Sequence, residues 1–455
     1  MSSAEPKQAF GTNAATPDDL VPRDLPLDIF APIEIIPARM NRRSFFRPFA
    51  CCLLAFSLGS QASGDPSGQL HSQRVFKVGV LVSLTGSGFS LGRSTVAALQ
   101  IAEEQIEAEA IRQHGGYRFQ FFVRDTQQNP SKALEAIQDL DKRGVQIIIG
   151  PQTSSEVRMI KPYADAHNIL VISQGSTASS LSIAGDNIFR LCPDDTLEAA
   201  AIVALMSNDG ILHIVPLWRN DAGNNGLHDS VEAQFKVLLG TTVTSGFRYE
   251  PSTTDFSRAT TEIAAQINDL ISQNTNPSTI AVYLAAFDEV VDIFTAAHSL
   301  GAPLSTTKWY GSDGVALSAA LIGDATAAAF AASVDYPNPI FGLPDSLQSE
   351  WQPISDAIEA RTGIKPDAFA LSTYDGLFVI QRALEDVGDL KNFAAFKAAF
   401  VSEADAYQGI TGSLALNSAG DRANGDFDFW AVRLENGSYG WVRIGSYANG
   451  SLSLF

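Results

Sequence analysis

The stretch from residue 145 to residue 177 constrains the fold of this chain more than any other. It contains two short apolar runs, residues 145–149 and 169–172, which are rich in β-branched side chains. Runs of this length and composition are typical of buried strands in a parallel sheet. Residues 156–167, between the two runs, are amphipathic and long enough to form a crossover helix. The stretch therefore predicts a βαβ unit whose strands are parallel neighbours.

A loop of small hydroxyl residues follows each predicted strand. Thr153, Ser154 and Ser155 follow the first strand, and Ser176 and Thr177 follow the second. Both loops should lie at the carboxyl edge of the sheet, where open α/β sheets bind their ligands. Hydroxyls and the free N–H groups of a helix start suit a carboxylate or another small anion. The alternative is that Thr153 and Ser176 only cap helices, which is the plainer interpretation of either loop alone.

Strand and helix patterns alternate along the chain from residue 75. Strands are predicted at residues 75–84 and 117–124 with a long helix between them, an order that implies a doubly wound parallel sheet. The alternation breaks at residues 189–193, and a second α/β set of similar size follows, with a strand at residues 243–249. The tail, residues 427–447, reads as a hairpin around an Asn-Gly turn. The 455 residues exceed what one core holds, so we predict two α/β domains.

The composition excludes several classes of partner. The chain carries 31 Lys+Arg and 50 Asp+Glu, which gives a net charge of −19. This excess of negative charge argues against nucleic acid and anionic membranes as partners. Cys51 and Cys52 lie near the N-terminus, which leaves Cys192 alone in the rest of the chain. No intrachain disulfide can form there, and the six scattered histidines add no metal motif, so we expect no metal and no cofactor.

The N-terminal segment has the pattern of an export signal. Residues 1–39 are rich in Pro and Asp without a clear period, and we interpret them as a non-native or disordered extension before a start at Met40. Residues 40–62 combine a basic beginning, an apolar run and small residues where a signal peptidase cleaves. The Arg42-Arg43 pair also resembles a twin-arginine export signal. We therefore expect a periplasmic protein.

Two glycine-rich motifs after the first strand suggest enzymes, and both fit poorly. Gly88-Phe89-Ser90-Leu91-Gly92 satisfies GxSxG, the nucleophile motif of serine hydrolases. A nucleophile elbow places its serine at the strand end, whereas four loop residues, 85–88, intervene after the strand here, and no earlier strand supplies an oxyanion loop. Gly86, Gly88 and Gly92 depart from the dinucleotide-binding spacing as well. We therefore predict that the chain is not an enzyme.

Asp313 would attract a ligand charge opposite to the one that the hydroxyl loops prefer. It follows a predicted strand at residues 308–310 in the sequence Gly311-Ser312-Asp313-Gly314, again at a carboxyl end. A carboxylate that faces two anion-binding loops across a cleft would suit a zwitterion. The alternative is an ordinary turn residue, because Ser-Asp-Gly is common in turns.

Taken together, these features give the chain from about residue 75 to its end a resemblance to the type I periplasmic binding proteins, in particular to the leucine/isoleucine/valine-binding family that serves ABC importers. Each motif is weak alone, and their order and spacing carry the resemblance. The motifs are Val78-Gly79-Val80-Leu81, Leu84-Thr85-Gly86, Asp125 before Asn129-Pro130, Ile149-Gly150-Pro151, Ser173-Gln174-Gly175-Ser176-Thr177, Phe189-Arg190 with Pro193-Asp194-Asp195, Gly311-Ser312-Asp313-Gly314, Tyr374-Asp375-Gly376 and Gly409-Ile410-Thr411-Gly412.

The resemblance implies an α/β fold of two Rossmann-like lobes, parallel sheets flanked by helices, joined by three hinge crossovers and closing on a ligand between them. The first lobe would comprise residues 75–192 plus about 337–411, and the second residues 193–336 plus about 426–455. The break found at residues 189–193 coincides with the first crossover that the family implies.

The resemblance also assigns roles to individual residues. Ser154 or Ser155, with Ser176 and Thr177, matches the positions that hold a ligand carboxylate, and Asp313 matches the acidic residue that binds its ammonium group.

Aromatic residues of the second lobe cover the ligand in that family. Phe287 stands where a tyrosine is common, so it keeps the ring and lacks the hydroxyl. Gly223 replaces another common tyrosine, and we expect the nearby Trp218 to compensate. These departures affect which ligand side chain the site would accept, and they do not affect the expected fold.

From these features we predict an exported, monomeric solute-binding protein without catalytic activity. Its ligand would be a small polar molecule, an amino acid or a related amide, delivered to the membrane permease of an ABC importer. One alternative keeps the fold and makes the protein an extracytoplasmic sensor subunit. The other is a secreted serine hydrolase that uses Ser90.

Overall fold

The computed structural model describes residues 74–86, 88–112, 117–238 and 240–455. The chain divides into two units, Met1–Gly68 and Gln69–Phe455, and all of the described residues belong to the second unit. The predictions for residues 1–39 and 40–62, including the signal peptide, lie outside the described residues.

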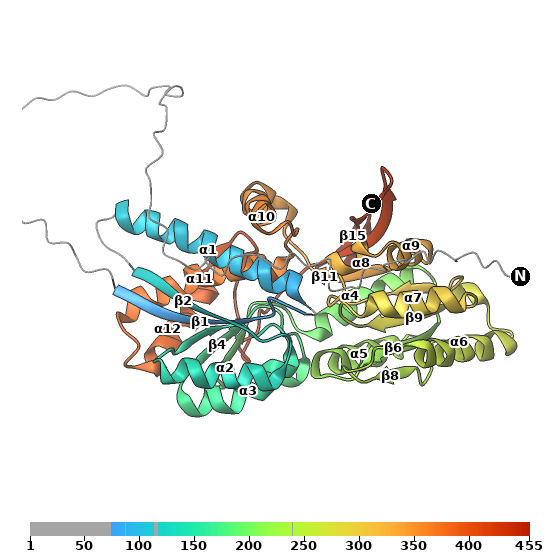
Figure 1. Cartoon of the computed structure of the whole chain (residues 1–455), viewed down its shortest axis with the longest axis horizontal. Coiled ribbons are helices and arrows are strands. Elements are labelled where there is room, and N and C mark those ends of the chain that lie inside the picture. Colours follow the sequence, from blue (N-terminus) through green and yellow to red (C-terminus); the bar gives the residue numbers. More distant parts are fainter. Residues whose placement is uncertain (1–73, 87, 113–116, 239) are drawn as a thin grey trace, which may run out of the picture. The chain divides into compact units, whose positions relative to one another are not determined.

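The first sheet contains five parallel strands in the order β2-β1-β3-β4-β5 (Figure 1). They are β1 (Arg74–Val82), β2 (Tyr117–Asp125), β3 (Ile147–Ile149), β4 (Leu170–Ser173) and β5 (Ile188–Arg190). β3 and β4 pair in parallel, with Ile147 opposite Leu170, and both strands are buried along their whole length. The helix α3 (Ser154–His167) connects them. The βαβ unit predicted for residues 145–177 is therefore confirmed.

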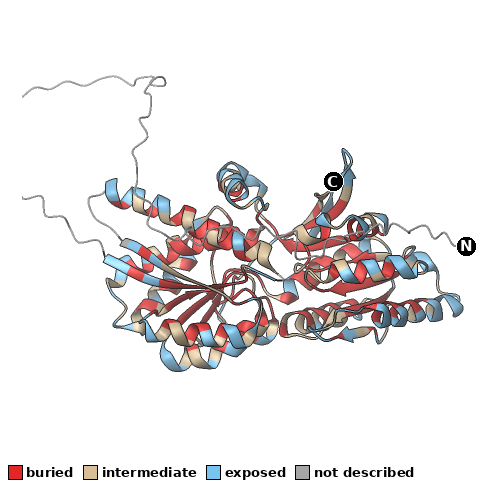
Figure 2. Ribbon diagram, viewed as in Figure 1, coloured by how far each residue is buried: buried red, intermediate tan, exposed pale blue. Residues whose placement is uncertain are grey.

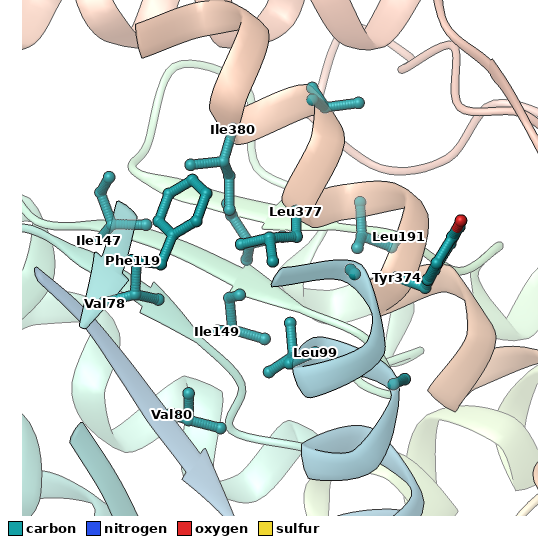
Figure 3. Close-up of a cluster of buried hydrophobic side chains, with 14 of the residues drawn as sticks. Val78, Val80, Leu99, Phe119, Ile147, Ile149, Leu191, Tyr374, Leu377 and Ile380 are labelled. Atoms are coloured by element: carbon teal, nitrogen blue, oxygen red, sulfur yellow. The ribbon is translucent and has the colours of Figure 1, made fainter. Parts of the chain in front are cut away.

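Helices cover both faces of this sheet. They are α1 (Phe89–Arg112), α2 (Pro130–Lys142) and α3, together with α10 (Gln348–Thr362), α11 (Ala368–Val387) and α12 (Phe393–Ala406) from much later in the chain. Figure 3 shows Leu99 of α1 and Leu377 and Ile380 of α11 packed against Val78 and Ile147 of the sheet. α2 and α3 pack on the opposite face. We call this sheet with its helices the first lobe.

The second sheet is also parallel, in the order β10-β9-β6-β7, with β8 paired to β6 as well. Its strands are β6 (His213–Arg219), β7 (Thr242–Val243), β8 (Phe247–Tyr249), β9 (Ile280–Ala285) and β10 (Lys308–Tyr310). Its helices are α4 (Asp195–Asn208), α5 (Ala222–Phe235), α6 (Ser257–Ser272), α7 (Val290–Leu300), α8 (Ala319–Gly323) and α9 (Ala325–Ser333). We call this sheet with its helices the second lobe.

The single strand predicted at residues 243–249 is wrong, because the structure splits it into β7 and β8. The break lies opposite Pro216 of β6, which has no N–H group to donate to a neighbouring strand. Gly246 turns away there with a φ of 58°. A side chain at this position would start 2.2 Å from the Pro216 carbonyl oxygen, so only glycine fits the turn.

A four-stranded antiparallel sheet completes the fold, in the order β11-β14-β15-β16. The strands are β11 (Pro337–Phe341), β14 (Phe427–Glu435), β15 (Ser438–Ala448) and β16 (Ser451–Leu454). The predicted tail hairpin is confirmed, since β14 and β15 pair around Asn436 and Gly437, which have φ of 51° and 86°. The remaining short elements are β12 (Gln408–Gly409), β13 (Gly412–Ser413), η3 (Ser179–Leu181), η4 (Pro277–Thr279) and η5 (Asp345–Leu347).

Within the described residues, the chain passes three times between the lobes, near residues 191–194, 342–347 and 414–426. Two of these passages are joined by a buried ion pair and by hydrogen bonds from a buried arginine. Arg190, which is fully buried, forms an ion pair with Asp421. Arg422 donates hydrogen bonds to the carbonyl oxygens of Leu191 and Thr411. The connections between the lobes are therefore close together and tied by hydrogen bonds.

Buried residues fill the strands and the inward faces of the helices, as Figure 2 shows. Among the helices in the described ranges, none combines the length and the apolar character needed to cross a membrane.

Candidate ligand-binding site

The two hydroxyl loops of the first lobe meet at Ser154. Its Oγ accepts a hydrogen bond from the Ser176 hydroxyl at 3.1 Å and another from the Ala178 N–H at 3.1 Å. Thr153 is the N-cap of α3, where its Oγ accepts the Glu156 N–H. The capping interpretation is thus correct for Thr153, whereas the Ser176 side chain binds the neighbouring loop. The expectation that the loops lie side by side is confirmed.

The facing wall is built by the loops that follow β9 and β10. Phe287 lies after β9, and Asp313 lies after β10 in a turn whose Asp313 N–H donates to Glu198 Oε1 at 3.0 Å. A Cβ at Gly314 would lie 2.8 Å from the Phe287 ring, so glycine lets the ring rest against this turn. The Arg219 guanidinium lies over the same ring, 5.4 Å from its centre. The aromatic side chain and the carboxylate are therefore held next to each other.

A cavity of about 40 Å³ lies between these walls. Four of the predicted residues line it: Ser154, Thr177, Phe287 and Asp313. Its other lining residues are Gln152, Thr153, Gly175, Asp195, Asp221, Gly223, Asn224 and Leu227. A second cavity, of about 80 Å³, shares part of these walls and continues over Gly88, Ser90, Ser318 and Asp367.

Three predicted residues are not among those that line either cavity. The Ser176 side chain is covered, since it is fully buried against Ser154. Trp218 stacks on His228 with ring centres 3.8 Å apart, and its Nε1 donates to Asn225. Ser155 points to the second lobe, where its Oγ accepts the Ala222 N–H at 3.1 Å.

The two lobes touch directly at the rim of the cavities. Besides the Ser155 contact, the Gly88 N–H of the first lobe donates to Asp288 Oδ2 of the second at 3.0 Å. The Ser318 hydroxyl donates to the other oxygen of Asp288 at 2.7 Å. Each of these bonds uses a polar group next to the cavity, so the lobes enclose it.

Two acidic side chains beside the cavity were not predicted as site residues. Asp195 is the first residue of α4 and is fully buried, and neither of its carboxylate oxygens has a hydrogen-bond partner within the described part of the chain. Glu198 lies one turn later and is 2 % exposed. Their spacing, i and i+3, could have placed both on one helix face from sequence, but an acidic first turn has an ordinary explanation in the helix dipole.

Burial makes this wall unfavourable for negative charge. It raises the pKa of Asp195 to about 8; the nearby Thr177 side chain opposes this rise, and the neighbouring Asp313 carboxylate adds to it. Burial also raises the pKa of Asp313 to about 6, and it raises the pKa of Glu198 well above its usual value, with Asp313 adding to the effect. A positively charged group placed among these carboxyls would reverse the shifts.

Ser90 lacks the surroundings of a hydrolase nucleophile. It lies near the start of α1 and lines the larger cavity, and its hydroxyl has no hydrogen-bond partner among the described residues. An activated serine needs a general base within hydrogen-bond reach. No histidine is among the residues that line either of the two cavities.

Comparison with known proteins finds both a sequence relative and solved structures with a similar fold. An uncharacterized protein of Methanocaldococcus jannaschii is 26% identical over 394 residues, which cover 82% of this chain and 89% of that protein. The crystal structure of a leucine-binding protein from Thermotoga maritima matches with a TM-score of 0.66 and 21% identity, covering 81% of this chain and 97% of that one. A solute-binding protein of an R. palustris ABC transporter, in complex with benzoate, matches with a TM-score of 0.62 and 19% identity over 84% of this chain and 98% of that one.

A family model described as periplasmic binding protein matches residues 75–438. The resemblance drawn from the sequence motifs and the predicted α/β fold with two parallel sheets are both confirmed. Proteins of this family bind ligands without transforming them, so the prediction that the chain is not an enzyme is also confirmed. The chain belongs to the periplasmic binding protein family.

Proposed function

We propose that this protein captures a small amino acid, or a related polar amide, between its lobes and delivers it to the permease of an ABC importer. The observation that carries the proposal is a cavity lined by Ser154 and Thr177 of the first lobe and by the Asp313 carboxylate of the second. A zwitterion has its two charges arranged to satisfy both walls at once.

The first-lobe wall supplies the groups that a ligand carboxylate needs. Ser154 and Thr177 line the cavity at the start of α3 and after β4. The N-terminus of α3 adds free N–H groups and the positive end of the helix dipole. In a cavity closed to water these hydrogen bonds are stronger than in solution. Ser176 supports the wall by holding the Ser154 hydroxyl.

The second-lobe wall supplies the counter-charge and the cover. Asp313 is placed to receive an ammonium group, and Phe287 lies beside it with its ring against Gly314. We assign Trp218 a supporting role, because it fixes Asn225 and His228 of α5 behind the cavity.

We further propose that the three passages between the lobes act as a hinge. The division predicted from the sequence, residues 75–192 plus about 337–411 and residues 193–336 plus about 426–455, differs from this hinge by a few residues, because the second passage lies near residues 342–347. Ligand binding would favour the closed arrangement, in which the Ala222 N–H donates to Ser155 and the Gly88 N–H donates to Asp288 across the rim. We also propose that the protein is exported to the periplasm through the predicted signal segment and that it acts there as a monomer.

Binding is tested by screening the full chain against amino acids, amides and aromatic acids by thermal shift, since a ligand of the folded state raises the melting temperature. Calorimetry then compares Asp313→Asn with wild type. Loss of a charge-assisted hydrogen bond should weaken binding about 10- to 100-fold. Asp229→Asn, whose side chain is 77% exposed on α5, is the matched control and should bind as wild type does. Unchanged affinity in Asp313→Asn would refute the assigned counter-charge.

A sensor role is the second candidate. It is favoured by a match to glutamate receptor 3.4 of Arabidopsis thaliana, 25% identical over 267 residues that cover 58% of this chain and 26% of that protein. Uptake of labelled ligand by cells that lack this protein separates the roles. An importer subunit predicts loss of uptake, whereas intact uptake with a lost cellular response to the ligand favours the sensor.

A further inference from the structure

Asp195 is buried without an ion-pair partner in the described part of the chain. It is fully buried, it lines the smaller cavity beside Asp313, and both carboxylate oxygens are without a hydrogen-bond partner among the described residues. Its backbone N–H donates to the Thr177 carbonyl oxygen at 2.9 Å, which fixes it next to the second hydroxyl loop. A buried carboxylate without a partner is costly, and such groups normally pair with a cation.

Helix capping does not require this carboxylate. Asp194 already caps α4, since its Oδ1 accepts the Thr196 N–H at 3.0 Å. Asp195 is therefore an additional acid at the helix start, and its oxygens accept none of the backbone N–H groups there.

Two carboxyls that line the smaller cavity, Asp195 and Asp313, have a third, Glu198, buried beside them. Asp195 and Glu198 lie one turn apart on α4, and Asp313 is joined to Glu198 through its N–H. The nearby cations are already used, since Arg190 pairs with Asp421 and Arg219 pairs with Asp221 and Glu289. None of the residues that line the smaller cavity is a lysine, arginine or histidine.

The spacing of the carboxyls does not suit a metal ion. In the described part of the chain, one group of three His, Cys, Asp or Glu residues has ligand atoms all within 4.8 Å of one another, and it is His228, Asp229 and Glu232 on α5. The three carboxyls at the cavity do not converge in this way. Carboxyls that are close but not convergent suit separate hydrogen-bond donors on one extended organic cation.

Resting on the proposed function, we infer that the ligand carries a second positive charge: a basic amino acid whose α-ammonium group binds Asp313 and whose side-chain ammonium group binds Asp195, with the buried Glu198 carboxyl adding negative charge beside them. Gly226 lets α5 pack closely beside Asp195 without displacing its carboxylate, because a Cβ there would lie 2.8 Å from Asp195 Oδ2. Leu227 and Phe287, which also line the cavity, offer an apolar surface to the methylene chain.

Calorimetry of the full chain with lysine, ornithine, norleucine and 1,4-diaminobutane tests the inference. Norleucine has the chain length of lysine without its terminal ammonium group, and the diamine lacks the carboxylate. We expect lysine or ornithine to bind at least about 10-fold more tightly than norleucine, as one charge-assisted hydrogen bond predicts. The diamine should bind more weakly than the basic amino acid, because it leaves the first-lobe wall unused.

Variants then locate the second charge. Asp195→Asn should reduce the affinity for lysine about 10- to 100-fold and leave that for norleucine within a few-fold, while Asp229→Asn changes neither. Glu198→Gln is the second variant, and it should reduce the preference for lysine over norleucine to a smaller extent. This variant still tests the inference if Asp195→Asn does not fold.

The outcomes separate the inference from the function on which it rests. Norleucine or another neutral amino acid binding as tightly as lysine, with Asp195→Asn and Glu198→Gln neutral, would overturn the second charge and leave the proposed function standing. No binding of any amino acid, amide or amine would overturn both.

Discussion

Asp195→Asn should change the pH dependence of stability of the empty protein in a defined direction. Burial raises the pKa of Asp195 from 3.8 to about 8. Between these values the folded state holds a proton that the unfolded chain has released, so stability falls as pH rises through this window. Asparagine does not titrate. The stability of the variant relative to wild type should therefore be lowest near pH 4 and should increase up to about pH 8.

The size of the effect follows from the shift. At about 1.36 kcal/mol for each pKa unit, a rise from 3.8 to about 8 sets an upper limit of about 6 kcal/mol. Relaxation around a buried charge reduces this value, and we expect a relative gain of about 1–4 kcal/mol. Asp313 and Glu198 titrate in both proteins, so their contributions to the pH dependence of stability cancel to first order when the variant is compared with wild type.

Urea unfolding at pH 4, 6 and 8, without added ligand, measures this difference directly. Asp229→Asn, on the exposed side of α5, provides the baseline. A difference between Asp195→Asn and wild type that stays constant with pH, or one that declines toward pH 8, would show that Asp195 is not an uncompensated buried carboxyl.

Three further substitutions test other parts of the structure. Ser155→Ala removes the bond to the Ala222 N–H across the rim and should weaken ligand affinity by about 0.5–1.5 kcal/mol in calorimetry; an affinity equal to that of wild type would argue against closure through this contact. Asp421→Asn leaves the buried Arg190 without its partner and should lower the urea-unfolding free energy by about 3–5 kcal/mol, whereas a loss under 1 kcal/mol would count against the fastened crossovers. Leu377→Ala opens space in the first-lobe core and should cost about 2–5 kcal/mol in the same assay without a change in ligand affinity, so a selective loss of binding would contradict its purely structural role.

Patterned segments of the chain were predictable because the pattern and the fold have the same cause. The apolar runs at residues 145–149 and 169–172 can be buried only as neighbouring strands, and the Asn436-Gly437 turn fixes the tail hairpin. The break between β7 and β8 was missed because it depends on Pro216, which lies in a different strand.

The site was harder to predict because side-chain direction depends on neighbours far away in sequence. Ser154 and Ser155 are adjacent, yet one completes the first-lobe wall and the other crosses to the second lobe. Trp218 was expected at the cavity, and its packing on His228 could not be read from its position in the chain. Asp195 looked like one of several acids at a helix start, and its lack of partners appears only in three dimensions.

A crystal structure of the full chain with its bound ligand tests the proposed binding site most directly. We expect one ligand between the lobes, its carboxylate within hydrogen-bond distance of Ser154 or Thr177 and its ammonium group within the same distance of Asp313. A ligand bound outside this cavity, or bound inside it with no contact to Asp313, would contradict the proposed site.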